Sequence, residues 1–160
     1  MRITWGASIL ALAVIAGASR TATTIEAAPP AAGAGAQAAA NVTPEQLEGY
    51  MKSISSTQTA LRAKLKENQL ADAAKDAQQL ATTFGDVEKF FAQRSKADGV
   101  SWAQLGKTGA TAVAGALTAG DAAKANTELG NMAASCKQCH AAYREGGPQA
   151  GGYTIKAGSI

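Results

Sequence analysis

The chain has 160 residues, and its 15 basic side chains exceed its 12 acidic ones by three. That length suits one domain with a hydrophobic core and is short for two. Between residues 43 and 145, 12 basic and 11 acidic side chains are interspersed, which excludes the basic stripe typical of nucleic-acid-binding proteins.

The N-terminus is typical of an export signal. Arg2 gives it a positive start, residues 7–18 form an apolar run, and Ala16-Gly17-Ala18 has the small-x-small form that signal peptidase cuts. The run is shorter than the roughly 20 residues of a membrane-spanning helix, although an uncleaved anchor stays the alternative. We therefore predict a cleaved signal peptide over residues 1–18, a periplasmic location and no transmembrane helix in the mature protein.

The composition then divides the remaining chain into three parts. Residues 19–42 are almost entirely Ala, Gly, Pro, Thr and Gln, so they bury too little side chain to fix their own backbone and are predicted to form a disordered linker. Residues 43–145 are the predicted folded domain. The Gly-rich residues 146–160 are predicted to be a flexible tail.

Within the folded domain the hydrophobic spacing is helical nearly throughout, which predicts an all-α fold. The first helix opens with a capping box of Thr43 and Gln46, with Pro44 at its first position, and it ends at the polar residues 67–69. Its predicted inward face consists of Leu47, Tyr50, Met51, Ile54, Leu61 and Leu65.

A second helix is predicted from Leu70 to the charged residues 94–98, with Gly99 ending it. Its predicted core side chains are Leu70, Ala73, Ala77, Leu80, Phe84, Val87 and Phe91. A third helix is predicted to begin at a capping-box pattern from Ser101 to Gln104. Its predicted core side chains are Trp102, Leu105, Val113 and Leu117, whereas Gly106, Gly109 and Gly115 each weaken it by about 1 kcal/mol relative to Ala.

A fourth helix is predicted over residues 122–144, because Gly120 is suited to end the previous helix and Asp121 to cap the next one. Its predicted inner side consists of Ala125, Leu129, Met132, Ala133, Cys136, His140 and Tyr143. Four helices of similar length with short connections favour an antiparallel four-helix bundle.

The fourth helix carries the sequence Cys136-Lys137-Gln138-Cys139-His140. Two cysteines three residues apart project from nearly the same helix face, and His140 lies one turn beyond Cys136. This spacing predicts thioether bonds from both cysteines to one haem, with His140 as the iron ligand. Three alternatives compete: a local disulfide, a thioredoxin-type redox pair, which would need a βαβ context, and a zinc site, which would need four ligands.

The second iron ligand is harder to assign. His140 is the only histidine, which excludes bis-histidine ligation. Outside the predicted signal peptide only Met51 and Met132 could offer a soft neutral sulfur, and Met132 lies eight residues before His140 on the same helix. Met51 is therefore the candidate, with plain core packing as its alternative role.

At this point the chain resembles the class II c-type cytochromes, that is, the cytochrome c′ family and its low-spin relatives. The resemblance rests on the ending Cys139-His140-Ala141-Ala142-Tyr143-Arg144 and, more weakly, on Gly49-Tyr50-Met51-Lys52 in the first helix. It covers about residues 43–145. It implies a four-helix bundle with one covalently attached haem c, and family members often form homodimers through their first two helices.

The resemblance also assigns roles to individual residues. It implies that Cys136 and Cys139 attach the haem, that His140 is the proximal ligand of the iron, that Met51 is the distal residue, and that Arg144 lies beside the proximal face. The chain departs from the family at Leu47, where many members carry a basic residue that reaches a haem propionate.

Taken together, the sequence predicts a periplasmic single-haem electron carrier with iron held by His140 and Met51, which exchanges electrons with redox partner proteins. The alternative is a five-coordinate protein, similar to cytochrome c′, that binds nitric oxide or carbon monoxide. We expect no enzyme activity, because the chain has no second histidine to serve as a distal base.

Overall fold

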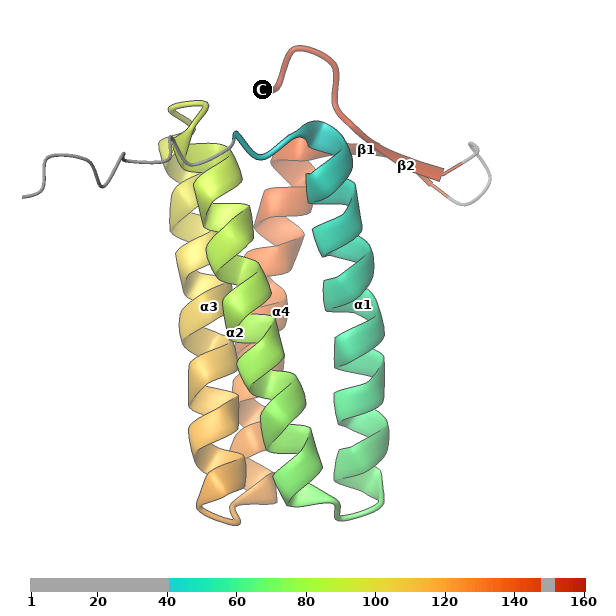
Figure 1. The fold of residues 1–160 in the computed structure, drawn as a ribbon, viewed down its shortest axis with the longest axis vertical. Helices are drawn as coiled ribbons and strands as arrows, with labels where there is room; N and C mark the ends of the chain where they lie inside the picture. Colours follow the sequence, from blue (N-terminus) through green and yellow to red (C-terminus); the bar gives the residue numbers. More distant parts are fainter. Residues whose placement is uncertain (1–40, 148–151) are drawn as a thin grey trace, which may run out of the picture. The chain divides into compact units, whose positions relative to one another are not determined.

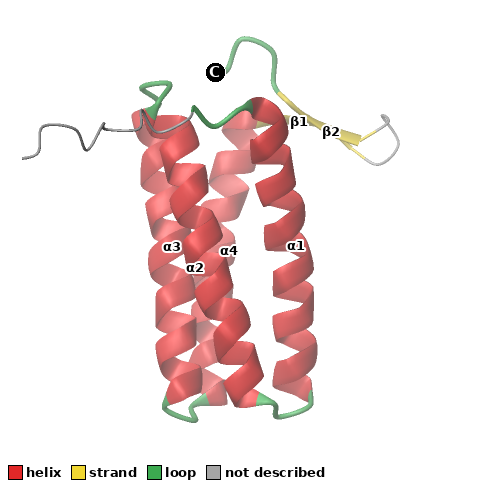
Figure 2. Ribbon diagram, viewed as in Figure 1, coloured by secondary structure: helices red, strands yellow, loops and turns green. Residues whose placement is uncertain are grey.

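The computed structural model describes residues 41–147 and 152–160, which form a four-helix bundle followed by a short hairpin (Figures 1 and 2). The elements are α1 Pro44–Lys66, α2 Leu70–Ala92, α3 Ala97–Thr118, α4 Ala122–Tyr143, β1 Arg144–Gly147 and β2 Gly152–Ile155. Helix α1 packs along α2, α2 along α3, and α3 along α4. The predicted bundle is confirmed, whereas the signal peptide and nearly all of the linker lie outside the described residues.

The start of α1 follows the predicted capping box. The Thr43 hydroxyl accepts a hydrogen bond from the Gln46 backbone N–H at 3.2 Å, and the Gln46 side chain accepts one from the Thr43 N–H at 2.8 Å. Folded structure begins slightly earlier than predicted, since Val42 is only 7% exposed. Its N–H donates to Gln93 Oε1 at 2.8 Å and its carbonyl accepts from Arg94 Nη2 at 3.1 Å, so Val42 belongs to the domain and not to the linker.

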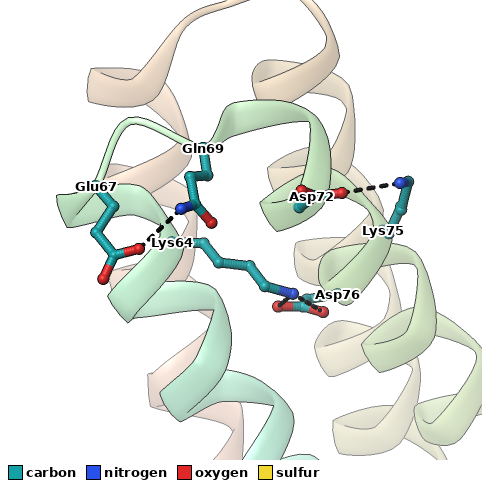
Figure 3. Close-up of polar contacts among 6 residues, drawn as sticks. All are labelled: Lys64, Glu67, Gln69, Asp72, Lys75 and Asp76. Carbon is teal, nitrogen blue, oxygen red and sulfur yellow. Dashed lines mark hydrogen bonds and ion pairs between the residues drawn. The ribbon is translucent and has the colours of Figure 1, made fainter.

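Polar contacts join α1 to α2 near the turn between them (Figure 3). The Lys64 ammonium lies 2.8 and 2.7 Å from the two carboxylate oxygens of Asp76, and both side chains are less than one-third exposed. Partial burial weakens screening by water, so this pair stabilises the helix contact more than the exposed pair of Lys75 and Asp72 on α2.

Three predictions about α3 and its start are wrong. The helix begins at Ala97, four residues before the expected Ser101, and Gly99 lies in its first turn instead of ending α2. A Cβ atom at Gly99 would clash with the Phe91 ring, so a glycine at this position lets the first turn of α3 pack closely against α2. Leu105, expected in the core, is 54% exposed.

The core instead combines large side chains of α2 with small ones of α3. Phe84, Phe90 and Phe91 of α2 are each 5% exposed or less. The facing positions of α3 include Ala103, Gly106 and Ala110, all buried. Val113, Leu117, Ala125, Leu129 and Met132 are buried as predicted. In the part of the chain that the structure describes, no helix has the length and apolar character to cross a membrane.

The chain after α4 contains an antiparallel hairpin where the sequence predicts a flexible tail. Strands β1 and β2 pair with Arg144 opposite Ile155 and Gly147 opposite Gly152. The Arg144 guanidinium lies 3.9 Å from the centre of the Tyr153 ring. The predicted domain boundary at residue 145 therefore falls within a strand, and regular structure continues to Ile155.

Candidate functional site

Cys136, Cys139 and His140 occupy the last two turns of α4, and all three side chains are half-buried. Both cysteines are free, so the local disulfide considered from the sequence is absent. The Cys136 thiol lies 3.6 Å from the carbonyl oxygen of Met132, one turn earlier in the helix. The arrangement thus presents two thiols and an imidazole from one short helical segment.

Burial controls the protonation of these three groups. It raises the pKa of the Cys136 thiol, and it raises the pKa of Cys139 to about 12, with further increases from Cys136 and from the Asp98 carboxylate. Burial lowers the pKa of His140, and the positive charge of Arg144 lowers it further. Near neutral pH the thiols therefore keep their protons and the imidazole is neutral, the form in which a histidine nitrogen binds a metal.

The described residues contain no cluster of side chains suited to bind a metal ion on its own. Among residues 41–147 and 152–160, no three His, Cys, Asp or Glu side chains are grouped so that they could hold a metal ion. The zinc alternative needs such a group. In the described residues, Cys136, Cys139 and His140 are therefore not part of such a group.

Met51 lies on α1, at the same end of the bundle as the cysteines. Figure 1 shows that α1 begins where α4 ends. Met51 is seven residues after Pro44, and Cys136 is seven residues before Tyr143, so both lie about 10 Å from that end. The Met51 side chain is half-buried, and α1 has no packing against α4 comparable to its packing against α2.

The other methionine outside the predicted signal peptide is part of the core. Met132 is 2% exposed, and its Cβ lies 3.0 Å from the position that a Cβ on Gly109 of α3 would take. Its side chain therefore lies in the contact between α3 and α4.

Two basic residues considered in the sequence analysis, Arg144 and Lys52, contact other side chains. Arg144 is exposed and lies over Tyr153, although it remains close enough to His140 to affect the histidine pKa. Leu47, in the first turn of α1, is 7% exposed. Lys52 lies 2.7 Å from Glu48 and is mostly exposed.

Phe91, Trp102 and Tyr143 are each predicted from the sequence to face the core, but the sequence does not predict that they meet around the end of α4. The Tyr143 hydroxyl donates a hydrogen bond to Asp98 on α3 at 2.5 Å. The Tyr143 ring lies 4.7 Å from the Phe91 ring and 6.1 Å from the Trp102 ring, measured between ring centres. These residues come from three helices and are up to 52 positions apart, so no local sequence pattern could have grouped them.

Two shallow hollows of about 570 and 540 Å³ lie elsewhere, between α2 and α3. Glu88, Gln104 and Lys107 line the first, and Ala81, Ala114 and Gly115 are among the lining residues of the second. Neither is lined by a residue of α1 or α4. The candidate site is therefore defined by the chemistry of its side chains and not by these hollows.

Comparison of the chain with protein-family models, curated proteins and solved structures finds no match. The functional assignment therefore depends on the residues and geometry described above.

Proposed function

We propose that this protein is an exported c-type cytochrome of class II that carries single electrons. One haem c is bound through thioethers to Cys136 and Cys139, and His140 is the proximal ligand of its iron. The observation that carries this proposal is the sequence Cys136-x-x-Cys139-His140 on the last turns of a bundle helix, with both thiols free.

The surroundings of these residues fit a flat prosthetic group. All three are half-buried, so a porphyrin at this position would be partly shielded from water by the helices. The side of the bundle between α1 and α4 lacks the close packing found between the other neighbouring helices. If a porphyrin binds between these two helices, Met51 of α1 and His140 of α4 would be the side chains that hold its iron.

The haem iron would supply the one-electron chemistry, and the protein side chains would hold and tune it. Met51 is the proposed distal ligand, because a neutral thioether favours ferrous iron and raises the reduction potential. A packed bundle keeps its helices in place when the iron changes oxidation state. Partners would be redox proteins of an electron-transfer chain, in the periplasm.

The second candidate function is a five-coordinate cytochrome that binds nitric oxide or carbon monoxide. The observation in its favour is that α1, which carries Met51, does not pack closely against α4. If the Met51 sulfur stays away from the iron, a small gas molecule can take the sixth position.

The proposal is tested by expressing the full chain in a bacterium that matures c-type cytochromes and staining a denaturing gel for haem. We expect the stain to migrate with the polypeptide. A variant with both Cys136→Ala and Cys139→Ala should lose the stain, whereas Lys137→Ala, an exposed position between the cysteines, should keep it. A wild-type polypeptide without stain would refute covalent attachment.

Two further measurements address export and spin state. Mass spectrometry of the mature protein should give an N-terminus at Ser19, as expected after signal cleavage. The absorption spectrum of the reduced protein should have the sharp, split bands of low-spin iron. A broad high-spin spectrum would instead favour the gas-binding candidate.

A further inference from the structure

A short hydrogen bond joins the start of α3 to the end of α4. The Tyr143 hydroxyl donates to Asp98 Oδ1 at 2.5 Å, and the same oxygen accepts the backbone N–H of Gly99 at 2.8 Å. A bond to a charged acceptor is stronger than one between neutral groups. Asp98 lies in the first turn of α3 and Tyr143 is the last residue of α4, so the bond connects the two helix ends.

Tyr143 is fixed on its other sides as well. The residue is 9% exposed, and its ring packs against Phe91 of α2 and Trp102 of α3. Its carbonyl oxygen accepts the backbone N–H of Lys156, just after β2, at 2.9 Å. Tyr143 therefore links α4 to two other helices and to the hairpin.

The residues proposed to bind haem lie one turn before this link. Cys139 is four residues and His140 three residues before Tyr143, and the Arg144 N–H donates to the His140 carbonyl. The last turn of a helix lacks some backbone partners and commonly frays. A terminal residue that is fixed from outside the helix suppresses that motion in the turn that carries Cys139 and His140.

We propose that Asp98 is a positioning residue for the site: by holding Tyr143 it fixes the last turn of α4 and the orientation of the His140 imidazole. Asp98 acts on His140 through Tyr143 and is not itself one of the residues proposed to bind the haem. The proposed orientation of His140 toward an iron rests on the proposed function. The proposed fixing of the last turn of α4 does not.

The first test measures amide hydrogen exchange by NMR in the purified mature protein. It can be done whether or not the purified protein contains haem. Asp98→Ala and Tyr143→Phe should each speed exchange of the Arg144 amide about tenfold, and the double variant should be no faster than either single one. Asp98→Asn keeps an acceptor oxygen and should stay within about threefold of wild type. Asp72→Ala, which changes the matching first-turn carboxylate of α2, should have no effect at Arg144.

Exchange at Arg144 that is unchanged in Asp98→Ala and Tyr143→Phe would overturn the proposal, as would an equal effect of Asp72→Ala. The second test is electron paramagnetic resonance of the ferric haem protein, in which a spread of imidazole orientations broadens the signals. We expect broader signals in Tyr143→Phe and Asp98→Ala, and wild-type widths in Asp98→Asn and Asp72→Ala.

The two tests separate the inference from the proposed function. Faster exchange with unchanged signal widths would mean that Asp98 supports the helix end without orienting His140, which overturns the positioning role. A wild-type protein without haem would refute the proposed function, and the exchange comparison alone would then decide whether Asp98 fixes the last turn of α4.

Discussion

The ring of Phe84 on α2 occupies the space where a side chain at Gly106 on α3 would have to go. A Cβ atom at Gly106 would lie 2.6 Å from the nearest ring carbon, far inside van der Waals contact. Phe84 is 5% exposed and has no free space into which to move without disturbing the core. The two helices can therefore approach closely only because position 106 has no side chain.

This contact predicts opposite effects for two Gly-to-Ala changes in the same helix. Gly106→Ala should destabilise the protein, because overpacking costs about 1–3 kcal/mol and outweighs the gain of roughly 0.5–1 kcal/mol in helix propensity. Gly115→Ala should stabilise it by roughly 0.5–1 kcal/mol, because a Cβ there meets nothing within 4 Å. Urea unfolding of both variants checks the prediction, and equal shifts of the same sign would contradict it.

Local sequence signals could be predicted, whereas tertiary contacts such as that between Phe84 and Gly106 could not. The capping box at Thr43 and the break at Gly120 and Asp121 are local signals, and the structure confirms both. The core side of α3 could be predicted only in part: Val113 and Leu117 are buried as expected, whereas Leu105 is exposed. The other buried positions of α3 are Ala and Gly. Gly99 and Gly106 among them lie against Phe rings of α2, and that pairing depends on tertiary packing.

Part of the candidate site could likewise be predicted from the sequence, and part could not. The helical spacing that groups Cys136, Cys139 and His140 is a property of consecutive residues, so it could be predicted from the sequence. The bond between Asp98 and Tyr143 could not, because it spans 45 residues and depends on how α3 and α4 are aligned. The stacking of Arg144 on Tyr153 likewise depends on a hairpin that the Gly-rich sequence did not indicate.

A second prediction concerns the thiols in protein made without haem-attachment machinery. With its pKa raised to about 12, Cys139 should be alkylated by iodoacetamide at pH 8 much more slowly than a free cysteine, whose pKa is about 8.5. Mass spectrometry of peptides after timed reaction measures the rate. In denaturant both cysteines should react quickly, which serves as the control. Rapid alkylation of Cys139 in the folded protein would show that the thiol is not shielded.

A third prediction follows from the pKa of Tyr143, which burial and the bond to Asp98 raise to about 12. The folded protein then holds this proton more tightly than the unfolded chain, whose tyrosine pKa is about 10. The resulting stabilisation is fully present below about pH 10. It is lost as the pH rises toward about 12.

Urea unfolding of wild type and Tyr143→Phe at several pH values isolates this effect, because lysine titration is common to both proteins. We expect the stability difference between them to be largest near neutral pH and to shrink above about pH 10. A difference that stays constant through this range would mean that the Tyr143 proton is not held more tightly in the folded state.

The last prediction compares the two methionines available to the iron. If Met51 is the distal ligand, Met51→Ala should convert a low-spin spectrum to a high-spin one, open the iron to carbon monoxide and lower the reduction potential, because a neutral thioether favours ferrous iron. Met132→Leu is the matched control. Met132 is 2% exposed and lies between α3 and α4, so this change of similar volume should cost less than about 1.5 kcal/mol of stability and leave the spectrum unchanged. Absorption spectroscopy and redox titration of the purified proteins distinguish the outcomes. A Met51→Ala variant that keeps the wild-type spectrum would assign Met51 to packing, and the gas-binding function would then be the better account of the site.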